Sequence, residues 1–445
     1  MIIHTETKIG RTSIFAKKVI DEDGNVVSER KVNISVFYEK YDDKEYVVIY
    51  SSKMRVITDA YRYLNVALGL APPNSRKSVA RALKLLYAFM ELTGYDLGSL
   101  NAKSYVELIA FLRGVTALPE NYSLITYRCN DTVNSYLATF RLYFQYLELP
   151  CEVLFETEKS SKKKVITQEA NLKPKYKGNL KVYKDNEVPK YISPNEFKEL
   201  YNLALKNNDR TAMILFHLMY AYGLRLGEAL GLTLEDVTEV KENNKYVPVI
   251  IIRNRMSDKY FQYAKRLLHV TNPKQYHGRD YRSSSNKIVI TNDFYAEICK
   301  YINEVHYNIA EKYPLNYEKT IADTVTRNND LEDDNHYLFL NRYARILTAQ
   351  GWNKHLKKYF LKAGIPIDQD KRKDNLSHRF RHGFAMFHVH FSEHPVKDLL
   401  TLSKLMRHNS ILSCASYFNP TKEDQRQLKE AFQKELQELI PEIKK

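Results

Sequence analysis

Three segments in the C-terminal half of the chain carry arginine, histidine and tyrosine residues that could together perform phosphoryl transfer. They are residues 222–228 (YGLRLGE), residues 376–382 (LSHRFRH), and residues 405–408 (LMRH) followed by Tyr417. Planar guanidinium groups hold the non-bridging oxygens of a phosphodiester and stabilise the charge that develops there during attack. A tyrosine phenol that has lost its proton is a nucleophile and yields a phosphotyrosine. Because a phosphotyrosine keeps the energy of the broken diester, this set of residues predicts phosphoryl transfer in which the broken bond is rejoined without ATP.

Each of these residues has a simpler interpretation when it is taken alone. An arginine after a glycine turn usually forms a surface salt bridge, and a tyrosine near a C-terminus usually packs in a core. A His-x-x-Arg pair on one helix face is ordinarily structural. Only the combination, in this order and in a basic chain, points to phosphoryl transfer.

The three segments resemble the motifs of the tyrosine recombinases, also called the phage-integrase family. The family's first motif, G-L-R-x-x-E, is matched at 223–228, and its second, H-x-L-R-H-x-F-A, stands here at 378–385. Its third motif, L-G-H-x-x-I with a later tyrosine, is matched by His408, Ile411 and Tyr417, and the offset (417 − 408 = 9) is the usual one. The resemblance is strong over about 190–420.

The resemblance implies a role for each matched residue. Two arginines would bind the scissile phosphate, two histidines would hydrogen-bond it and assist proton transfer, the tyrosine would attack, and a lysine would protonate the leaving 5′ oxygen. The implied catalytic residues are Arg225, Lys259, His378, Arg381, His408 and Tyr417. Glu228 and His382 would support them by orienting the arginines and packing the site.

The lysine is the member of this set that the motifs do not fix. The family places it in the hairpin between two strands of the catalytic domain, which we predict at 246–255 and 287–291. Lys259, just past the first strand, is the first choice, and Lys265 and Lys287 are the alternatives.

Two departures from the family pattern stand close to the predicted nucleophile. Arg407 replaces the glycine that usually precedes the motif histidine, and Ser413-Cys414 stand where paired threonines are common. Arg407 could add a phosphate contact or alter helix packing, and the sequence leaves both open.

Composition agrees with a polyanionic partner. The 445 residues include 68 Lys plus Arg against 53 Asp plus Glu, a formal charge of +15, and this surplus favours nucleic acid. The four cysteines are scattered and lack C-x-x-C spacing, which suits a reducing cytoplasm. The sequence shows no signal peptide and no apolar run of about 20 residues, so we expect a cytoplasmic protein without a membrane contact. His388, His390 and His394 lack matched Cys or carboxylate ligands, so no metal and no cofactor are expected.

The elements that must position these residues divide the chain into five predicted parts. They are a β-rich region at 1–52, a helical core-binding domain at 53–150, a lysine-rich linker at 151–190, a catalytic domain at 191–420 and a C-terminal helix at 421–445. The predicted fold class is mainly α with a small antiparallel β-sheet in the catalytic domain. Basic residues on the helix predicted at 75–93 are candidate DNA contacts: Arg76, Lys77, Arg81 and Lys84.

Two of these parts have alternative interpretations. Residues 1–52 could be a module that grips accessory DNA sites or a packing extension of the helical domain. Residues 421–445 could dock on a neighbouring protomer or pack on their own domain.

The resemblance implies a site-specific recombinase that acts on double-stranded DNA with specific recombination sites through a 3′-phosphotyrosyl intermediate. It also implies a homo-tetramer on DNA and a monomer or weak oligomer in the free state. The N-terminal region favours integration or excision of a mobile element. The alternatives are a type IB topoisomerase-like enzyme and a DNA-binding regulator without catalytic activity.

Overall fold

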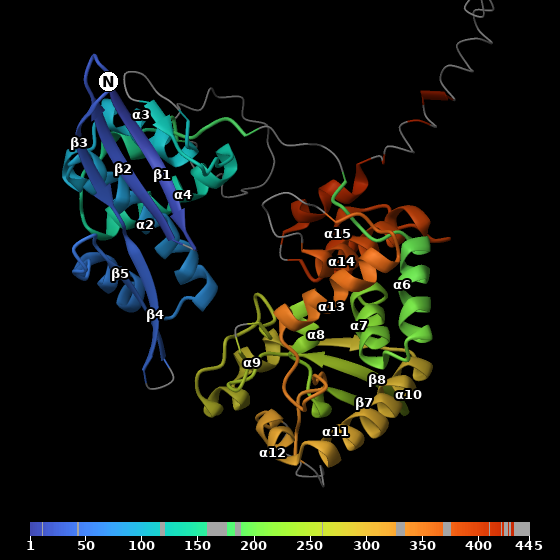
Figure 1. Ribbon diagram of the computed structural model, residues 1–445. Helices are drawn as coiled ribbons and strands as arrows, with labels where there is room; N and C mark the ends of the chain where they lie inside the picture. The colour runs from blue at the N-terminus through green and yellow to red at the C-terminus, as the bar shows by residue number, and fades with distance from the viewer. Residues whose placement is uncertain are drawn as a thin grey trace, which may run out of the picture. The chain divides into compact units, whose positions relative to one another are not determined.

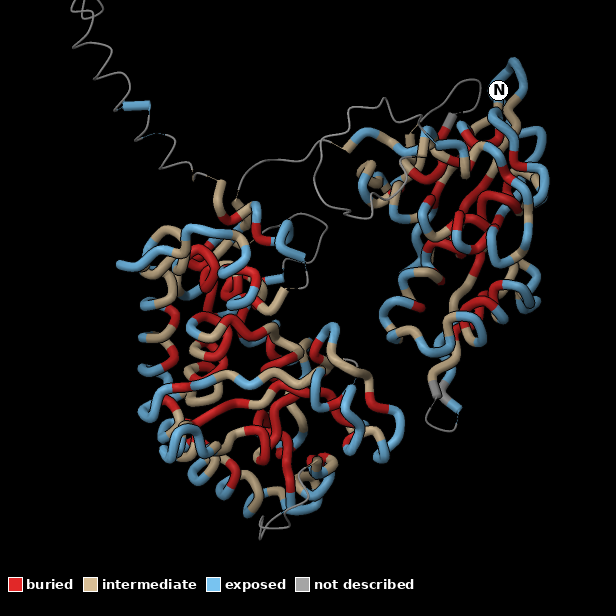
Figure 2. Tube along the Cα trace, turned by 180° about the vertical axis from the view of Figure 1, so that it is seen from behind, coloured by how far each residue is buried: buried red, intermediate tan, exposed pale blue. Residues whose placement is uncertain are grey.

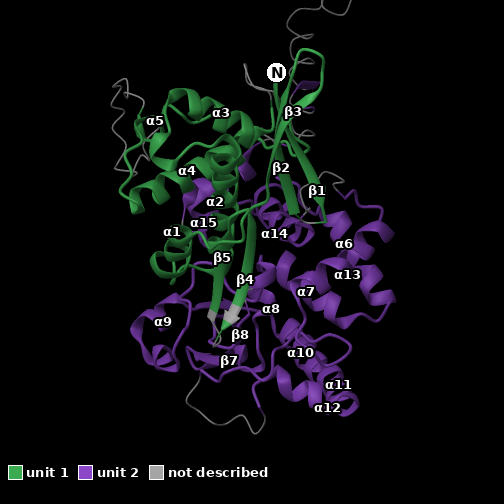
Figure 3. Ribbon diagram, turned by 60° about the vertical axis from the view of Figure 1, so that its left-hand side comes forward, with its two compact units in different colours: residues 1–184 green, residues 185–445 purple. Residues whose placement is uncertain are grey.

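The computed structural model of the protein consists of two compact units, residues 1–184 and residues 185–445 (Figure 3). Each unit has its own buried core (Figure 2). The structure describes residues 1–10, 12–41, 44–115, 121–157, 176–182, 188–259, 261–325, 334–367, 375–408, 410–419, 421, 426 and 429–430. The predicted C-terminal helix at 421–445 lies almost wholly outside the described residues.

The first unit begins with two β-sheets (Figure 1). One has the strand order β3-β2-β1-β6, in which β6 is parallel to β1 and the other pairs are antiparallel. The other is the antiparallel hairpin β4-β5. The strands are β1 (Ile2–Ile9), β2 (Thr12–Ile20), β3 (Val26–Val32), β4 (Ser35–Tyr41), β5 (Lys44–Tyr50) and β6 (Asn121–Ser123).

Helices pack on these strands. They are α1 (Thr58–Arg62) with the π-helix η1 (Tyr63–Ala67), α2 (Pro73–Thr93), α3 (Ala102–Arg113), α4 (Asn130–Tyr146) and the short α5 (Glu152–Phe155). The helix predicted at 75–93 corresponds to α2, which begins two residues earlier. Pro73 occupies its first turn, and Gly94, at φ +84°, ends it.

The strands and helices of the first unit share one hydrophobic core. Phe15 of β2 meets Phe111 of α3 with ring centroids 4.9 Å apart, and Val47 of β5 is fully buried in the same cluster. The ranges 1–52 and 53–150, which the sequence separated, are therefore one compact unit. Part of the predicted linker also belongs to it, since Tyr105 donates a hydrogen bond to the Gly178 carbonyl over 2.7 Å.

The second unit surrounds a three-stranded antiparallel sheet with helices. The sheet has the order β7-β8-β9 and is built from β7 (Val237–Glu242), β8 (Lys245–Ile252) and β9 (Asn286–Val289). The helices before it are α6 (Pro194–Lys206), α7 (Arg210–Tyr220) and α8 (Leu226–Leu230), and the short α9 (Arg279–Ser284) precedes β9. The helices after it are α10 (Asn292–Tyr301), α11 (Tyr307–Lys312), α12 (Pro314–Tyr317), α13 (Ala349–Lys362), α14 (Leu376–Met386) and α15 (Leu399–Leu405).

The predicted fold class, mainly α with a small antiparallel sheet, is confirmed. The strands predicted at 246–255 and 287–291 correspond to β8 and β9. β7, which carries fewer apolar residues, was not predicted. In the described part of the chain, no helix is long and apolar enough to cross a bilayer.

Close packing of α7 against α14 brings distant parts of the sequence together. Phe216 stacks on Phe380 with ring centroids 5.1 Å apart. A Cβ atom on Gly383 would lie 2.6 Å from the Tyr220 ring, so glycine is what allows the close approach. The turn after α7, which carries the first motif, therefore lies against the helix that carries the second.

Candidate active site

The first motif forms a glycine turn that leads into α8. Gly223 has φ +61°, a conformation that side chains disfavour, and Arg225 is the N-cap of α8. The Arg225 backbone N–H donates to Glu228 Oε2 over 2.9 Å, and its guanidinium pairs with Glu228 Oε1 at 2.5 Å. This capping box fixes the first arginine of the predicted site.

Glu228 collects three arginines around one buried carboxylate. Besides Arg225, it pairs with Arg407 at 3.2 Å and with Arg381 at 3.8 Å. Burial alone would raise the pKa of this carboxyl, but the three guanidinium groups lower it below its ordinary value. Glu228 is therefore ionised at neutral pH and holds the three guanidinium groups close together.

Arg381 connects the three motifs directly. It lies on α14, is completely buried, and donates hydrogen bonds to the Gly223 carbonyl of the first motif and to the Met406 carbonyl of the third. Arg225 and Arg381 therefore meet at the same carboxylate, that of Glu228.

Tyr417 lies against α14, in the 3-10 helix η8 (Ile411–Phe418). Its hydroxyl is 2.7 Å from His382 Nδ1, and its backbone carbonyl is 2.8 Å from His390 Nε2. The residue is only 3% exposed. Burial raises the pKa of its phenol to about 12, against the opposing influence of Arg381, so the phenol is protonated at neutral pH.

The three histidines of the site are neutral at pH 7. Burial, followed by nearby positive charge, lowers the pKa of His378 and His408 to about 4. Burial, followed by the neighbouring His378, lowers the pKa of His382 to about 3. A neutral imidazole keeps one nitrogen as an acceptor, so His382 can accept the hydrogen bond of the Tyr417 hydroxyl.

Arg407 takes part in the architecture of the site. It adopts φ +51°, the left-handed conformation that explains why glycine is usual there. Its guanidinium donates to the Gly223 carbonyl over 2.9 Å and the Tyr222 carbonyl over 3.2 Å. Of the two roles left open, these contacts favour packing of the third motif on the first.

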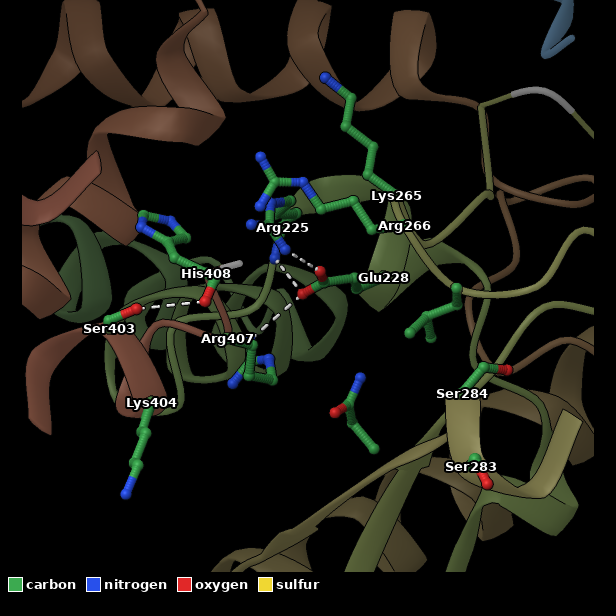
Figure 4. Close-up of a pocket in the computed structure, with 12 residues that line it drawn as sticks. Arg225, Glu228, Lys265, Arg266, Ser283, Ser284, Ser403, Lys404, Arg407 and His408 are labelled. Carbon is green, nitrogen blue, oxygen red and sulfur yellow. Dashed lines mark hydrogen bonds and ion pairs between the residues drawn. The ribbon is translucent and has the colours of Figure 1, made fainter. Parts of the chain in front are cut away.

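A pocket of about 380 Å³ opens beside these residues (Figure 4). Figure 4 shows the side chains of Arg225, Arg266 and His408 around the same space, with Glu228 between Arg225 and Arg407. Lys265, Ser283, Ser284, Asn286 and Lys404 also line it. The cationic and hydroxyl groups make the pocket suited to an anion. Arg381, His378 and Tyr417 are not among the residues that line it.

Lys265 is the one of the three candidate lysines that the structure brings to this pocket. Its charge is also among those that lower the pKa of His378. Lys259, the first choice from the sequence, is exposed and lies outside the pocket lining, and Lys287 is exposed on β9. The long segment between β8 and β9 folds back at Asn254, which bonds to Ala264, and this brings residues after 264 to the pocket.

The four basic residues predicted to contact DNA have different environments on α2. Arg76 is 8% exposed and donates to the Glu45 carbonyl over 2.8 Å, so it ties α2 to β5. Lys77 pairs with the Glu45 carboxylate at 2.7 Å. Lys84 is half-buried, and burial lowers its pKa, whereas Arg81 is exposed. Arg76 therefore has a structural role in the unit.

Several residues that line the pocket were not identified from the sequence. Arg266, Ser283, Ser284 and Asn286 line the pocket although no motif marks them, and only the adjacent pair Lys265-Arg266 gave a local hint. Among the described residues, no group of three or more His, Cys, Asp and Glu side chains is arranged to hold a metal ion.

The second unit is thus a mainly helical body in which arginines, histidines and a tyrosine gather beside a pocket lined largely by cationic and polar side chains. The chain is 25% identical over 294 residues to "Transposase A from transposon Tn554" of Staphylococcus aureus, a match that covers 63% of this chain and 76% of that protein. No protein-family model matches the chain.

Two solved structures also show partial similarity to this chain. The Tn1549 transposon integrase in complex with transposon right end DNA matches at 15% identity and a TM-score of 0.48, covering 84% of this chain and 98% of that chain. The XerH site-specific recombinase bound to its difH substrate matches at 16% identity and a TM-score of 0.44, covering 77% and 76%. In sequence, the chain is thus similar to a transposase of a mobile element.

Proposed function

We propose that this protein is a tyrosine-type site-specific DNA recombinase that integrates or excises a mobile element. The observation that carries the proposal is the convergence of the three motifs, in which Arg381 bonds to backbone carbonyls of the first and third motifs and His382 bonds to Tyr417. The transposon origin of the sequence relative supports the mobile element.

In the proposed reaction, a DNA phosphodiester enters the pocket and its non-bridging oxygens meet Arg225 and His408. The Tyr417 oxygen attacks phosphorus, a Tyr417–phosphate bond forms, and the bond to the 5′ oxygen breaks. The phenol proton passes to a neutral histidine, for which His382 is in place at 2.7 Å. Lys265 is the proposed acid that gives its proton to the 5′ oxygen. Rejoining reverses these steps.

The site must rearrange before it can react. Arg381 is fully buried, its guanidinium is bonded to two carbonyls, and Tyr417 is 3% exposed. We therefore infer that DNA binding moves η8 and brings the Tyr417 oxygen to the phosphate as its proton passes to His382. In the proposed division of labour, the unit 1–184 binds DNA and the unit 185–445 performs catalysis. Assembly of four protomers on two duplexes and the cytoplasmic location remain part of the proposal.

The test is covalent trapping on a nicked duplex built from the sequences that flank the gene. After cleavage the short downstream fragment diffuses away, so a DNA adduct should accumulate with the wild-type protein and be absent with Tyr417→Phe. Tyr343→Phe, which removes a hydroxyl from a tyrosine that is 46% exposed, is the matched control and should form the adduct.

The two alternative functions give different results in this experiment. A regulator without catalytic activity forms no adduct with any variant. A type IB topoisomerase-like enzyme forms the adduct and also relaxes a supercoiled plasmid that lacks the flanking sequences, whereas the proposed recombinase requires them.

A further inference from the structure

The segment that carries Lys265 and Arg266 is held by one buried asparagine. Asn254, 3% exposed, follows β8 and accepts a hydrogen bond from the Ala264 backbone N–H over 2.7 Å. Its side-chain amide donates to three carbonyls, those of Ala264 at 3.1 Å, Leu267 at 3.3 Å and Leu268 at 3.2 Å. These bonds bracket Lys265 and Arg266 on both sides.

The bracketed turn has an unusual backbone conformation. Arg266 has φ +74°, which is costly for a residue with a side chain and persists only where the surroundings enforce it. Because the amide of Asn254 satisfies the carbonyls before and after this residue, it is the group that enforces the turn.

The opposite side of the segment lies on α8, the helix that begins at Arg225. A Cβ atom on Gly227 would lie 2.7 Å from the Tyr263 carbonyl oxygen, and one on Gly231 would lie 2.5 Å from the Gln262 carbonyl oxygen. Only glycine permits this approach. The segment is therefore packed directly on the helix that carries the first motif.

Asn254 is itself anchored by buried groups. The Tyr281 hydroxyl donates to its backbone carbonyl over 2.8 Å. The next residue, Arg255, is completely buried and pairs with Asp236 at 2.8 Å. Because its own carbonyl and the next residue are both held by buried groups, the Asn254 side chain has a fixed position from which it can hold the turn.

We propose that Asn254 is a positioning residue that sets the location of Lys265 and Arg266 at the pocket. This inference rests on the proposed function for its catalytic consequence, but its structural consequence can be measured on the free protein. It predicts that loss of the Asn254 amide loosens the turn and withdraws the proposed acid without removing any group that touches DNA.

The structural consequence is tested by limited trypsin digestion of the folded full-length chain, since trypsin cleaves after Lys265 and Arg266. Asn254→Ala should raise the initial rate of cleavage at this turn at least about tenfold, which corresponds to the loss of one or two buried hydrogen bonds. Asn254→Asp keeps the acceptor for the Ala264 N–H and loses the donors, so it should also raise the rate. An unchanged rate in both variants would refute the proposal.

Asn335→Ala is the matched control. Asn335 is also buried in the second unit, at 2% exposure, and its side chain bonds to the Glu235 N–H at 3.2 Å and the Asp323 carbonyl at 3.1 Å. Each variant is digested at the same number of degrees below its own melting temperature. Under this condition, the Asn335→Ala variant should be cleaved after Lys265 and Arg266 at the wild-type rate. Equal acceleration by Asn335→Ala would mean general loosening and would count against a specific role for Asn254.

The catalytic consequence is tested with a duplex in which sulfur replaces the 5′ bridging oxygen. A thiolate leaves without protonation, because thiols ionise near pH 8.5 whereas alcohols do not. Asn254→Ala and Lys265→Ala should each slow cleavage of the oxygen substrate at least about tenfold and recover most of the rate with sulfur. Equal loss on both substrates would show that Asn254 does not act through the acid. No adduct with the wild-type protein on either substrate would instead refute the proposed function and leave the trypsin result standing.

Discussion

Arg407 stands where the family pattern has glycine, and its contacts compensate for an unfavourable backbone conformation. Its φ of +51° costs an ordinary side chain about 1 kcal/mol relative to glycine. The guanidinium offsets that cost by bonding to the Gly223 carbonyl and to the Glu228 carboxylate. The position therefore keeps the backbone that glycine would give and adds a tie between the third motif and the first.

Because the buried histidines of the site are neutral, the free energy of unfolding should depend on pH. The pKa of His382 is about 3 in the folded chain and near 6.5 when exposed, so the unfolded chain binds more protons between these values. Stability should therefore fall as the pH drops from about 6.5 toward 4. In thermal unfolding at pH 4 to 8, His382→Asn should reduce this dependence by on the order of 2 kcal/mol.

The exposed His394 provides the control for this experiment. His394→Asn should leave the slope of melting temperature against pH as it is in the wild type. An acid dependence that is the same in His382→Asn as in the wild type would contradict the burial of a neutral imidazole at this position.

At the scale of elements, the turn between α7 and α8 and the helix α14 depend on each other. A Cβ atom on Gly223 would lie 2.7 Å from the Phe384 ring, and the residue has φ +61°. A side chain at this position would therefore both strain the backbone and collide with Phe384. The same close contact couples the turn that carries Arg225 to α14.

Gly223→Ala should destabilise the protein by about 2–4 kcal/mol, because it combines the cost of positive φ with overpacking. Gly364→Ala separates the two effects, since Gly364 has φ +68° but nothing within 4 Å of a Cβ atom. It should cost only about 1 kcal/mol. Chemical denaturation measures both values, and equal losses would show that the contact with Phe384 is unimportant.

At the scale of the whole molecule, the charge of +15 predicts DNA binding that depends strongly on salt. Affinity for a non-specific duplex should fall roughly 10³-fold between 50 and 200 mM salt if about six phosphates are contacted. Arg81→Ala should reduce the slope of log affinity against log salt by about 1, because Arg81 is exposed on α2.

The neighbouring Arg76→Ala provides the contrast. Its buried guanidinium holds the Glu45 carbonyl, so its loss should lower the melting temperature and leave the salt slope of the folded protein unchanged. The reverse pattern, a changed slope with Arg76→Ala and none with Arg81→Ala, would overturn the assignment of these two residues.

The sequence by itself determined the motif residues and several elements, among them α2, β8 and β9. Helix ends such as Pro73 and Gly94 follow from local backbone chemistry. The motif residues could be identified because their types and spacing are specific even without coordinates.

Only the tertiary structure decided which residues meet. Lys265 lines the pocket and Lys259 does not, because a long segment folds back at Asn254. The contact of Arg76 with the Glu45 carbonyl depends on its burial against β5. The shared core of 1–52 and 53–150 likewise arises from contacts such as Phe15 with Phe111. Local preferences set the conformation of a few neighbouring residues, whereas these outcomes depend on packing between segments that are remote in the chain.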